Sequence, residues 1–411
     1  MPSRRVFLKN SALAMFGIGA APGWLARATY ANDGSRARKK ILIAIFQRGA
    51  VDGLNVVIPH AELNYYTLRP SLAIGRPDGT ERTAIDLDGR FGLHPAMKSL
   101  KPLWDRGQLA IVEAVGSPDP TRSHFDAQDY MESGTPGFKA TGDGWLNRAL
   151  CPEQRAAVLR AVSVGPDLPR TLRGRNQVVA VEDIGDFDIK GGPAGNAFES
   201  MYGAASDAVL NGTARETFEA VKIMQSIRRA PYLPANGAQY PSRRLGQRLE
   251  QIARLIKADV GLEVAFADVG GWDTHVNEVG PEPHTGQLAN LLREFSDAVA
   301  AFSQDMGDRM EDITVVTMSE FGRTAKENGN HGTDHGHANV MFVLGGRVRG
   351  GKVYGEWPGL DDDQLHEGRD LSVRTDFRTV LAELVAKQLG NRTTGRVFPG
   401  FSGPCDVGIL S

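Results

Sequence analysis

Short, continuous apolar runs separated by amphipathic stretches recur along this 411-residue chain and constrain its fold more than any other feature. A strand that is buried on both faces has this pattern, because neither face meets water. Five runs fit this description: residues 41–46, 109–115, 262–269, 313–318 and 340–344. Helical patterns occupy residues 244–257, 287–306 and 376–389. The alternation predicts an α/β fold in which helices cover both faces of a mainly parallel sheet.

The first 28 residues have the three parts of an export signal in the usual order. Arg4 and Arg5 precede a modestly apolar stretch at 11–25, and residues 26–28 supply a small-x-small cleavage pattern. The stretch is too short and too interrupted by Gly and Pro to span a membrane. We therefore expect a twin-arginine signal at 1–28, used by the twin-arginine translocase, and a polar spacer at 29–40. The mature chain would have no membrane span and would be periplasmic or secreted. The alternative is a basic tail on a cytosolic protein.

Residues 41–411 are expected to form one domain, with a less regular cap or excursion at about 156–240, where Gly and Pro recur. The net charge of −2 and the scattered basic residues give no footprint for nucleic acid. The two cysteines, Cys151 and Cys405, lie far apart in the sequence, which leaves open whether they pair.

Polar motifs follow the ends of the predicted strands, where open parallel sheets bind their ligands. Three histidines fall within residues 331–337, and Asp273 and His275 are two apart, so both side chains would face the same way on an extended segment. Mixed imidazole and carboxylate donors suit zinc, manganese or iron better than calcium. We therefore predict one or two divalent ions, with zinc or manganese favoured, and ligands drawn from seven residues: Asp52, Asp273, His275, Glu320, Asp334, His335 and His337. The alternative for any single histidine is a capping or hydrogen-bonding role.

A hydroxyl group stands at the start of the helical stretch that follows the second strand. Ser123, or with less support Thr121, would face free backbone N–H groups and the positive end of the helix dipole. Beside a metal such a hydroxyl can lose its proton and attack phosphorus or sulfur. The alternative is that either residue only caps the helix. Arg122 or Arg323 would hold an anionic substrate, because a guanidinium group matches phosphate or sulfate oxygens.

Six motifs resemble those of the bacterial family called domain of unknown function 1501: residues 47–55, 122–128, 143–148, 273–275, 319–324 and 332–338. The resemblance covers about residues 40–401. That family is grouped with the alkaline-phosphatase and sulfatase superfamily. The resemblance therefore implies an alkaline-phosphatase-like, three-layer α/β/α sandwich with one or two metal ions and a Ser, Thr or modified Cys nucleophile. Phe321 stands where the superfamily places a histidine ligand, and this departure removes one ligand from a two-metal site.

These features predict an exported metal-dependent hydrolase of phosphate or sulfate esters, acting on a small anionic ester with a Ser or Thr nucleophile. The alternative is a non-catalytic exported binding or assembly protein on a degenerate form of the same fold, acting with a secreted protein partner. Both hypotheses remain open at this point, because a fold does not determine function.

Overall fold

The computed structural model describes residues 39–139, 141–151, 157–184 and 208–411, with side chains described from residue 219 onward in the last range. The predicted twin-arginine signal and most of the polar spacer therefore lie outside the described residues. The same holds for residues 185–207 of the predicted excursion.

A nine-stranded sheet forms the centre of the molecule, with the order β11-β5-β10-β9-β1-β8-β6-β7 and β12 paired to β5. The strands have these bounds: β1 Ile41–Gln47, β5 Leu109–Gly116, β6 Ala161–Val164, β7 Val179–Val181, β8 Val264–Val269, β9 Ile313–Met318, β10 Asn339–Gly345, β11 Lys352–Tyr354 and β12 Thr375–Asp376. All pairings are parallel except those of β10, which runs antiparallel to β5 and β9. The sheet is therefore mainly parallel, as predicted.

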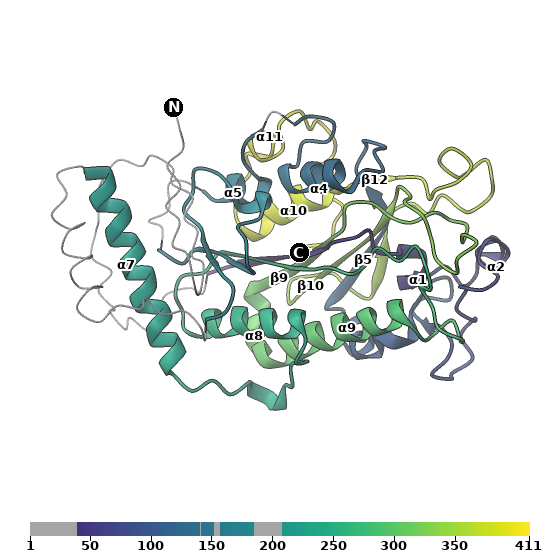
Figure 1. Ribbon diagram of the computed structural model, residues 1–411, viewed down its shortest axis with the longest axis horizontal. Helices are drawn as coiled ribbons and strands as arrows, with labels where there is room; N and C mark the ends of the chain where they lie inside the picture. The colour runs from purple at the N-terminus through teal and green to yellow at the C-terminus, as the bar shows by residue number, and fades with distance from the viewer. Residues whose placement is uncertain (1–38, 140, 152–156, 185–207) are drawn as a thin grey trace.

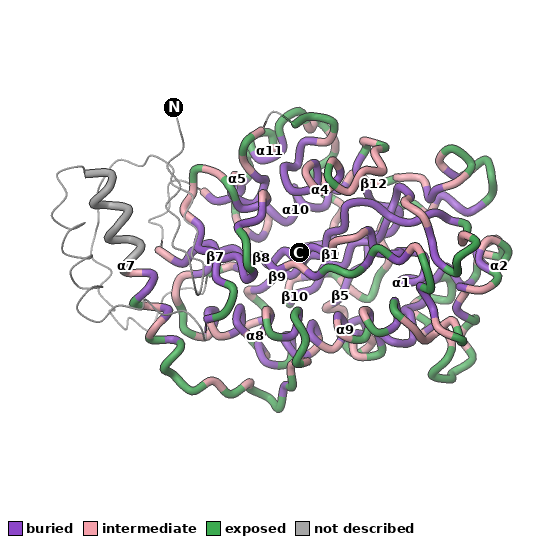
Figure 2. The backbone as a smooth tube through the Cα atoms, viewed as in Figure 1, coloured by how far each residue is buried: buried purple, intermediate pink, exposed green. Residues whose placement is uncertain are grey.

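Helices cover both faces of this sheet (Figure 1). One layer contains α8 (Arg244–Lys257) and α9 (Gln287–Met306), and the other contains α4 (His124–Ser133), α5 (Trp145–Ala149), α10 (Phe377–Gln388) and α11 (Thr394–Val397). Alternate residues of β1 point to opposite faces. Ile43 packs in the core under α8 and α9, whereas Leu42 packs in the core under α10. The predicted three-layer α/β/α sandwich is confirmed, with the sheet buried between its helices (Figure 2).

The remaining elements lie around these three layers. Two short strands, β6 and β7, come from the stretch predicted as a cap or excursion, so part of that stretch extends the sheet instead. The other helices are α1 Gly53–Val56, α2 Leu63–Leu68, α3 Lys101–Asp105 and α7 Ala208–Arg229, of which α3 and α7 contribute to the core under α8 and α9, with 3-10 turns at Pro95–Leu100, Arg170–Leu172, Ala235–Gly237 and Gly307–Asp312. A small second sheet has the order β2-β4-β3, with β2 Val57–Ile58, β3 Ile85–Asp86 and β4 Gly92–Leu93.

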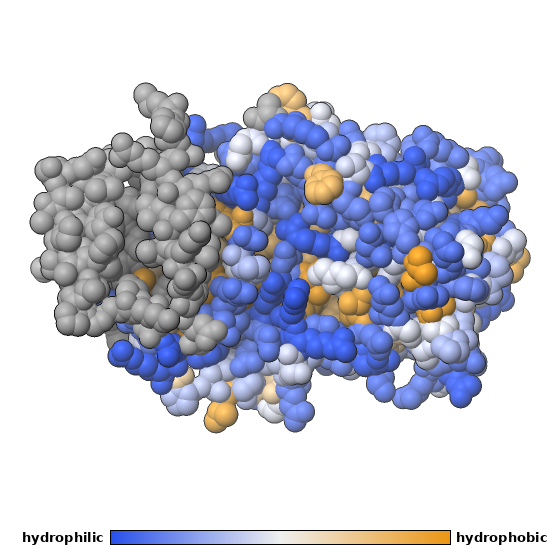
Figure 3. Space-filling view, in the orientation of Figure 1, coloured by the Kyte–Doolittle hydropathy of each residue, from blue (hydrophilic) through white to orange (hydrophobic). Residues whose placement is uncertain are grey.

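Apolar side chains are scattered singly over the described part of the face drawn in Figure 3, which is otherwise largely hydrophilic. Among the described residues, every helix is too short or too polar to cross a membrane. Cys151 and Cys405 are free thiols.

Candidate metal centre

Five chain segments meet at one edge of the sheet. The parallel strands β1, β5, β8 and β9 all end at this edge, and β10 begins there because it runs in the opposite direction. The strand order therefore brings five segments together: the loops after β1, β8 and β9, the start of α4 and the loop before β10. The prediction that polar motifs at strand ends would converge is confirmed.

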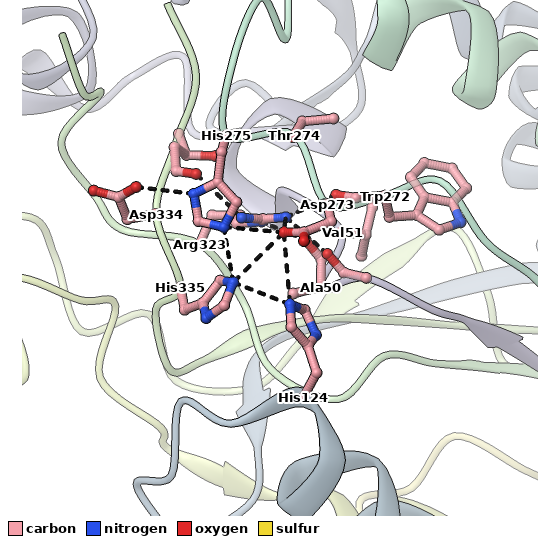
Figure 4. Close-up of polar contacts among 12 residues, drawn as sticks. Ala50, Val51, His124, Trp272, Asp273, Thr274, His275, Arg323, Asp334 and His335 are labelled. Carbon is pink, nitrogen blue, oxygen red and sulfur yellow. Dashed lines mark hydrogen bonds and ion pairs between the residues drawn. The ribbon is translucent and has the colours of Figure 1, made fainter. Parts of the chain in front are cut away.

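Three imidazole rings and one carboxylate point toward one another in this cluster (Figure 4). His124 is the first residue of α4, Asp273 and His275 follow β8, and His335 precedes β10. The Nε2 atom of His335 lies 3.0 Å from that of His124 and 2.8 Å from that of His275. Oδ1 of Asp273 lies 3.5, 3.1 and 3.5 Å from the Nε2 atoms of His124, His275 and His335. The ligand atoms of His124, Asp273 and His335 therefore all lie within 4.8 Å of one another, and His275 Nε2 lies within 3.1 Å of two of them.

The other nitrogen of each ring fixes which tautomer is present. Nδ1 of His335 lies 2.9 Å from the carbonyl oxygen of Arg122, which can only accept a hydrogen bond. Nδ1 of His124 faces Glu320 Oε1 at 2.8 Å, and Nδ1 of His275 faces Asp334 Oδ1 at 2.9 Å. Each Nδ1 therefore donates, and in a neutral ring the Nε2 atom carries a lone pair directed into the cluster.

The carboxylates around the cluster are held ionised. Burial alone would raise the pKa of Asp273, but the hydrogen bond and the charge of Arg323 lower it overall. Burial would likewise raise the pKa values of Glu320 and Asp334, but the hydrogen bonds that each carboxylate accepts, first from the imidazole it faces, together lower them. These three carboxylates and the Arg323 guanidinium group together carry a formal charge of two negative units.

This donor set fits a divalent metal ion. His335 Nε2 and Asp273 Oδ1 each lie 2.8–3.5 Å from the other donor atoms, and lone pairs this close repel one another unless a cation lies among them. Zinc bonds of about 2.0–2.1 Å in a tetrahedral arrangement would separate neighbouring donors by about 3.3 Å. The charge of a divalent ion would also balance the two formal negative units. The ligand side chains are 23–47% exposed, so an ion can enter from solvent.

Arg323 does not face a substrate. Its guanidinium group is fully buried, and its Nη2 donates to Asp273 Oδ1 at 2.6 Å. The remaining bonds go to backbone carbonyls of the converging loops: Gly49, Ala50, Trp272 and Thr333. The predicted anion-holding role of Arg323 is replaced by a structural one, because its donors are already used within the protein.

Asp52 does not reach the cluster. Its two carboxylate oxygens accept from Arg69 at 2.5 and 2.9 Å, and both side chains are almost fully buried. Glu278 is buried beside this pair, and its pKa is raised well above the usual value by burial first and then by the charge of Asp52. The structure therefore places Asp52 in a buried ion pair, in contrast to the predicted ligand role.

The other predicted ligands divide into three groups. Asp273, His275 and His335 are in the cluster, whereas Glu320 and Asp334 orient the rings of its histidines. His337 points away, because its Nε2 lies 3.0 Å from the carbonyl oxygen of Ser117 and its ring packs on His366 with a centroid distance of 4.5 Å. The structure thus brings three of the seven predicted ligands to the centre and two more around it.

The predicted nucleophiles precede His124 in the sequence. Ser123 is the N-cap of α4, and its Oγ accepts from the backbone N–H of Asp126 at 3.5 Å. Thr121 Oγ1 accepts from the backbone N–H of Ser123 at 3.3 Å. Arg122 pairs with Asp370 at 2.6 Å and with Glu367 at 2.7 Å. The capping interpretation of Ser123 therefore describes the observed contact, and no contact assigns a nucleophile.

His124 is the ligand candidate that the sequence analysis missed. It adjoins Ser123 and lies in one of the motifs that follow a strand end, where the other candidates were found. A histidine directly after a helix N-cap residue, at the same edge as Asp273 and His275, was the available signal.

Comparison with known proteins identifies the family of the chain. The family model described as "Protein of unknown function (DUF1501)" matches residues 39–398. The chain belongs to this family. The resemblance read from the six motifs is thereby confirmed. No curated protein matches the sequence.

Several solved structures have some similarity to this DUF1501 member. The C-terminal periplasmic domain of EptC from Escherichia coli, in complex with Zn, is 10% identical with a TM-score of 0.34, over 75% of this chain and 73% of that chain. A sulfatase from Pseudoalteromonas sp. is 11% identical with a TM-score of 0.34, over 77% and 64%. The lipoteichoic acid synthase LtaP from Listeria monocytogenes is 9% identical with a TM-score of 0.32, over 75% and 66%. TM-scores this low do not assign an activity or a site.

Proposed function

We propose that this protein is an exported metal-dependent hydrolase of phosphate or sulfate esters. The observation that carries the proposal is the convergence of three Nε2 lone pairs and the Asp273 carboxylate, each ring being held by an acceptor on its other nitrogen. His124, Asp273, His275 and His335 would hold one divalent ion, with zinc or manganese favoured. Export to the periplasm or the cell exterior rests on the twin-arginine pattern at residues 1–28.

A bound divalent ion would polarise an ester oxygen and lower the pKa of a nucleophile beside it. The protein adds a favourable place for negative charge, because His124 begins α4 and the positive end of that helix dipole faces the cluster. Glu320 and Asp334 keep the Nδ1 protons in place, and Arg323 holds the Asp273 carboxylate. These contacts orient the ligand side chains.

Ser123 is the hydroxyl that we assign to attack on the ester, because it adjoins His124. Its cap bond of 3.5 Å is at the long limit for a hydrogen bond, so releasing the hydroxyl costs little. A transient ester on Ser123 would form as the alcohol of the substrate leaves, and water would then cleave that ester.

Metal analysis by mass spectrometry tests the proposal on the mature protein without a histidine tag. We expect about one equivalent of zinc or manganese in the wild type, and a loss of most of it in His335→Ala. His337→Ala is the matched control, since His337 is two residues away and faces Ser117 rather than the cluster. It should keep its metal.

An activity screen then covers phosphate monoesters, phosphate diesters and sulfate esters. Ser123→Ala should abolish turnover while retaining the metal. A protein that binds no metal even after reconstitution would contradict the hydrolase proposal. Such a result would favour the non-catalytic role, in which the chain acts with a secreted protein partner.

A further inference from the structure

A buried carboxyl group joins two of the loops that carry the ligands of the candidate metal centre. Glu278 is fully buried, and its Oε2 atom accepts hydrogen bonds from the hydroxyl groups of Thr274 at 3.0 Å and Thr333 at 2.8 Å. Both threonines are buried as well. Thr274 belongs to the loop after β8, and Thr333 belongs to the loop before β10. One carboxyl oxygen is therefore the common acceptor for two loops.

Both threonines are close in sequence to the ligands. Thr274 lies between Asp273 and His275, and its side chain points away from the cluster (Figure 4). Thr333 lies two residues before His335. Because a trans peptide fixes the distance between adjacent Cα atoms at about 3.8 Å, a shift of either threonine is passed on to the backbone of a ligand.

Backbone hydrogen bonds complete the connection around Glu278. The N–H of Thr333 donates to the carbonyl oxygen of Thr274 at 3.2 Å, which joins the two loops directly. The N–H of Glu278 donates to the carbonyl oxygen of His331 at 2.8 Å, and the Glu278 carbonyl oxygen accepts from Leu288 at the start of α9 at 3.0 Å. Glu278 is thus held by a main-chain helix contact, which makes it a fixed point for both loops.

From this geometry we infer that Glu278 is a positioning residue of the metal centre. It acts through Thr274 and Thr333, not by coordination, and it sets how far apart the two ligand loops lie. The separation that depends on it is the 2.8 Å between the Nε2 atoms of His275 and His335. This inference rests on the proposed metal centre, to which it adds a residue.

Zinc affinity of the full mature protein, measured by competition with a chromophoric chelator, tests the inference. Glu278→Leu removes the shared acceptor and should weaken zinc binding about tenfold. Glu278→Gln keeps a side-chain oxygen that can accept both hydroxyl hydrogen bonds, so it should stay within about threefold of the wild type. Burial and then the charge of Asp52 raise the pKa of Glu278 well above its usual value, so glutamine also preserves an uncharged side chain.

Two variants of nearly unchanged volume test each arm separately and carry the test if Glu278→Leu does not fold. Thr274→Val and Thr333→Val should each weaken zinc binding about three- to fivefold. The double variant should lose little more than either single one, because each loss breaks the same bridge. Thr171→Val is the matched control, since Thr171 is equally buried and donates to Glu132 at 3.1 Å, away from the ligand loops. Its zinc affinity should stay unchanged.

Cobalt substitution gives a result that a loss of stability alone would not produce, because the visible absorption bands of bound Co²⁺ depend on the geometry of its ligands. At saturating cobalt we expect shifted bands in Thr274→Val and Thr333→Val, and wild-type bands in Thr171→Val. Unshifted bands in both ligand-loop variants would overturn the inference.

Equal zinc affinities in Glu278→Leu and the wild type would also overturn the inference, and so would losses in Glu278→Gln or Thr171→Val as large as that in Glu278→Leu. In each of these cases metal uptake by the wild type would still support the metal centre. A wild-type protein that binds neither zinc nor cobalt would overturn the proposed function and the inference together.

Discussion

Replacing Glu320 with glutamine should weaken zinc binding although Glu320 is not a ligand. Its Oε1 atom accepts three hydrogen bonds, from His124 Nδ1 at 2.8 Å, from the Gly49 backbone N–H at 2.8 Å and from Gln128 Nε2 at 2.9 Å. Glutamine has the same shape, and its carbonyl oxygen can keep these contacts. The change therefore removes the negative charge and little else.

The size of the effect follows from the burial of that charge. Glu320 is fully buried, so solvent screens its interaction with His124 very little. Loss of such a carboxylate partner of a ligating histidine costs about 10–100-fold in metal affinity, or about 1.4–2.7 kcal/mol. Asp334 plays the same part for His275 but is 51% exposed, so Asp334→Asn should cost only about threefold.

Competition with a chromophoric chelator measures these affinities at fixed pH. Glu132→Gln is the matched control, because Glu132 is also buried and belongs to the same network but bonds Arg48 and Thr171 rather than an imidazole. Its zinc affinity should stay within about twofold of the wild type. Equal zinc affinity in Glu320→Gln and wild type would refute the reasoning, since His124 could then not be a ligand oriented by this carboxylate.

Three further predictions concern stability. Asp52→Asn should destabilise the fold by about 3 kcal/mol in urea unfolding, because it breaks the buried ion pair with Arg69, while the metal content of folded protein stays unchanged. Burial raises the pKa of Glu113 to about 8 from a usual 4.5. The protonated carboxyl group therefore contributes fully to the free energy of unfolding below about pH 4.5, and this contribution is lost as the pH rises through 8. Glu113→Gln should remove that loss, worth up to about 5 kcal/mol, when unfolding is measured across this pH range. Gly322→Ala should lower the thermal midpoint strongly, because a Cβ atom there would lie 1.8 Å from the Ala338 carbonyl oxygen, and an unchanged midpoint would show that the loops can separate.

The main strands and helices could be predicted from the sequence because their patterns are long and unmixed. The runs at 41–46 and 313–318 became β1 and β9, and the helical pattern at 244–257 became α8. The strands β6 and β7 were missed, since they have four and three residues and lie in a Gly- and Pro-rich stretch. The antiparallel direction of β10 could not be read either, because a strand that is buried on both faces has the same apolar pattern in either direction.

The position of the site could be predicted more reliably than the role of each residue in it. Strand ends identify which loops meet, whereas ligand and supporting roles depend on where each side chain points. His335 and His337 are two residues apart in one motif, yet one enters the cluster and the other bonds Ser117. Asp52 lies in the loop after the first strand, as predicted, but its carboxylate accepts hydrogen bonds from the buried Arg69, which is 17 residues away in the sequence. Such partners are visible only in three dimensions.

The way these loops are joined indicates that the protein, rather than the metal, fixes the ligand geometry. Arg323 ties backbone carbonyls of three loops to the carboxylate of Asp273, so this ligand is oriented before any ion arrives. The loops can approach this closely because glycine has no Cβ atom. Gly49 has a φ of 116°, and a Cβ atom there would lie 2.6 Å from the Asp273 backbone nitrogen. A Cβ atom on Gly336 would lie 2.3 Å from the backbone of Arg323. Glycine in these motifs is therefore a requirement of the site's construction. A centre held in this way loses little conformational entropy on binding its ion, so its affinity depends mainly on the charge and tautomer of the ligands, which Glu320 and Asp334 control.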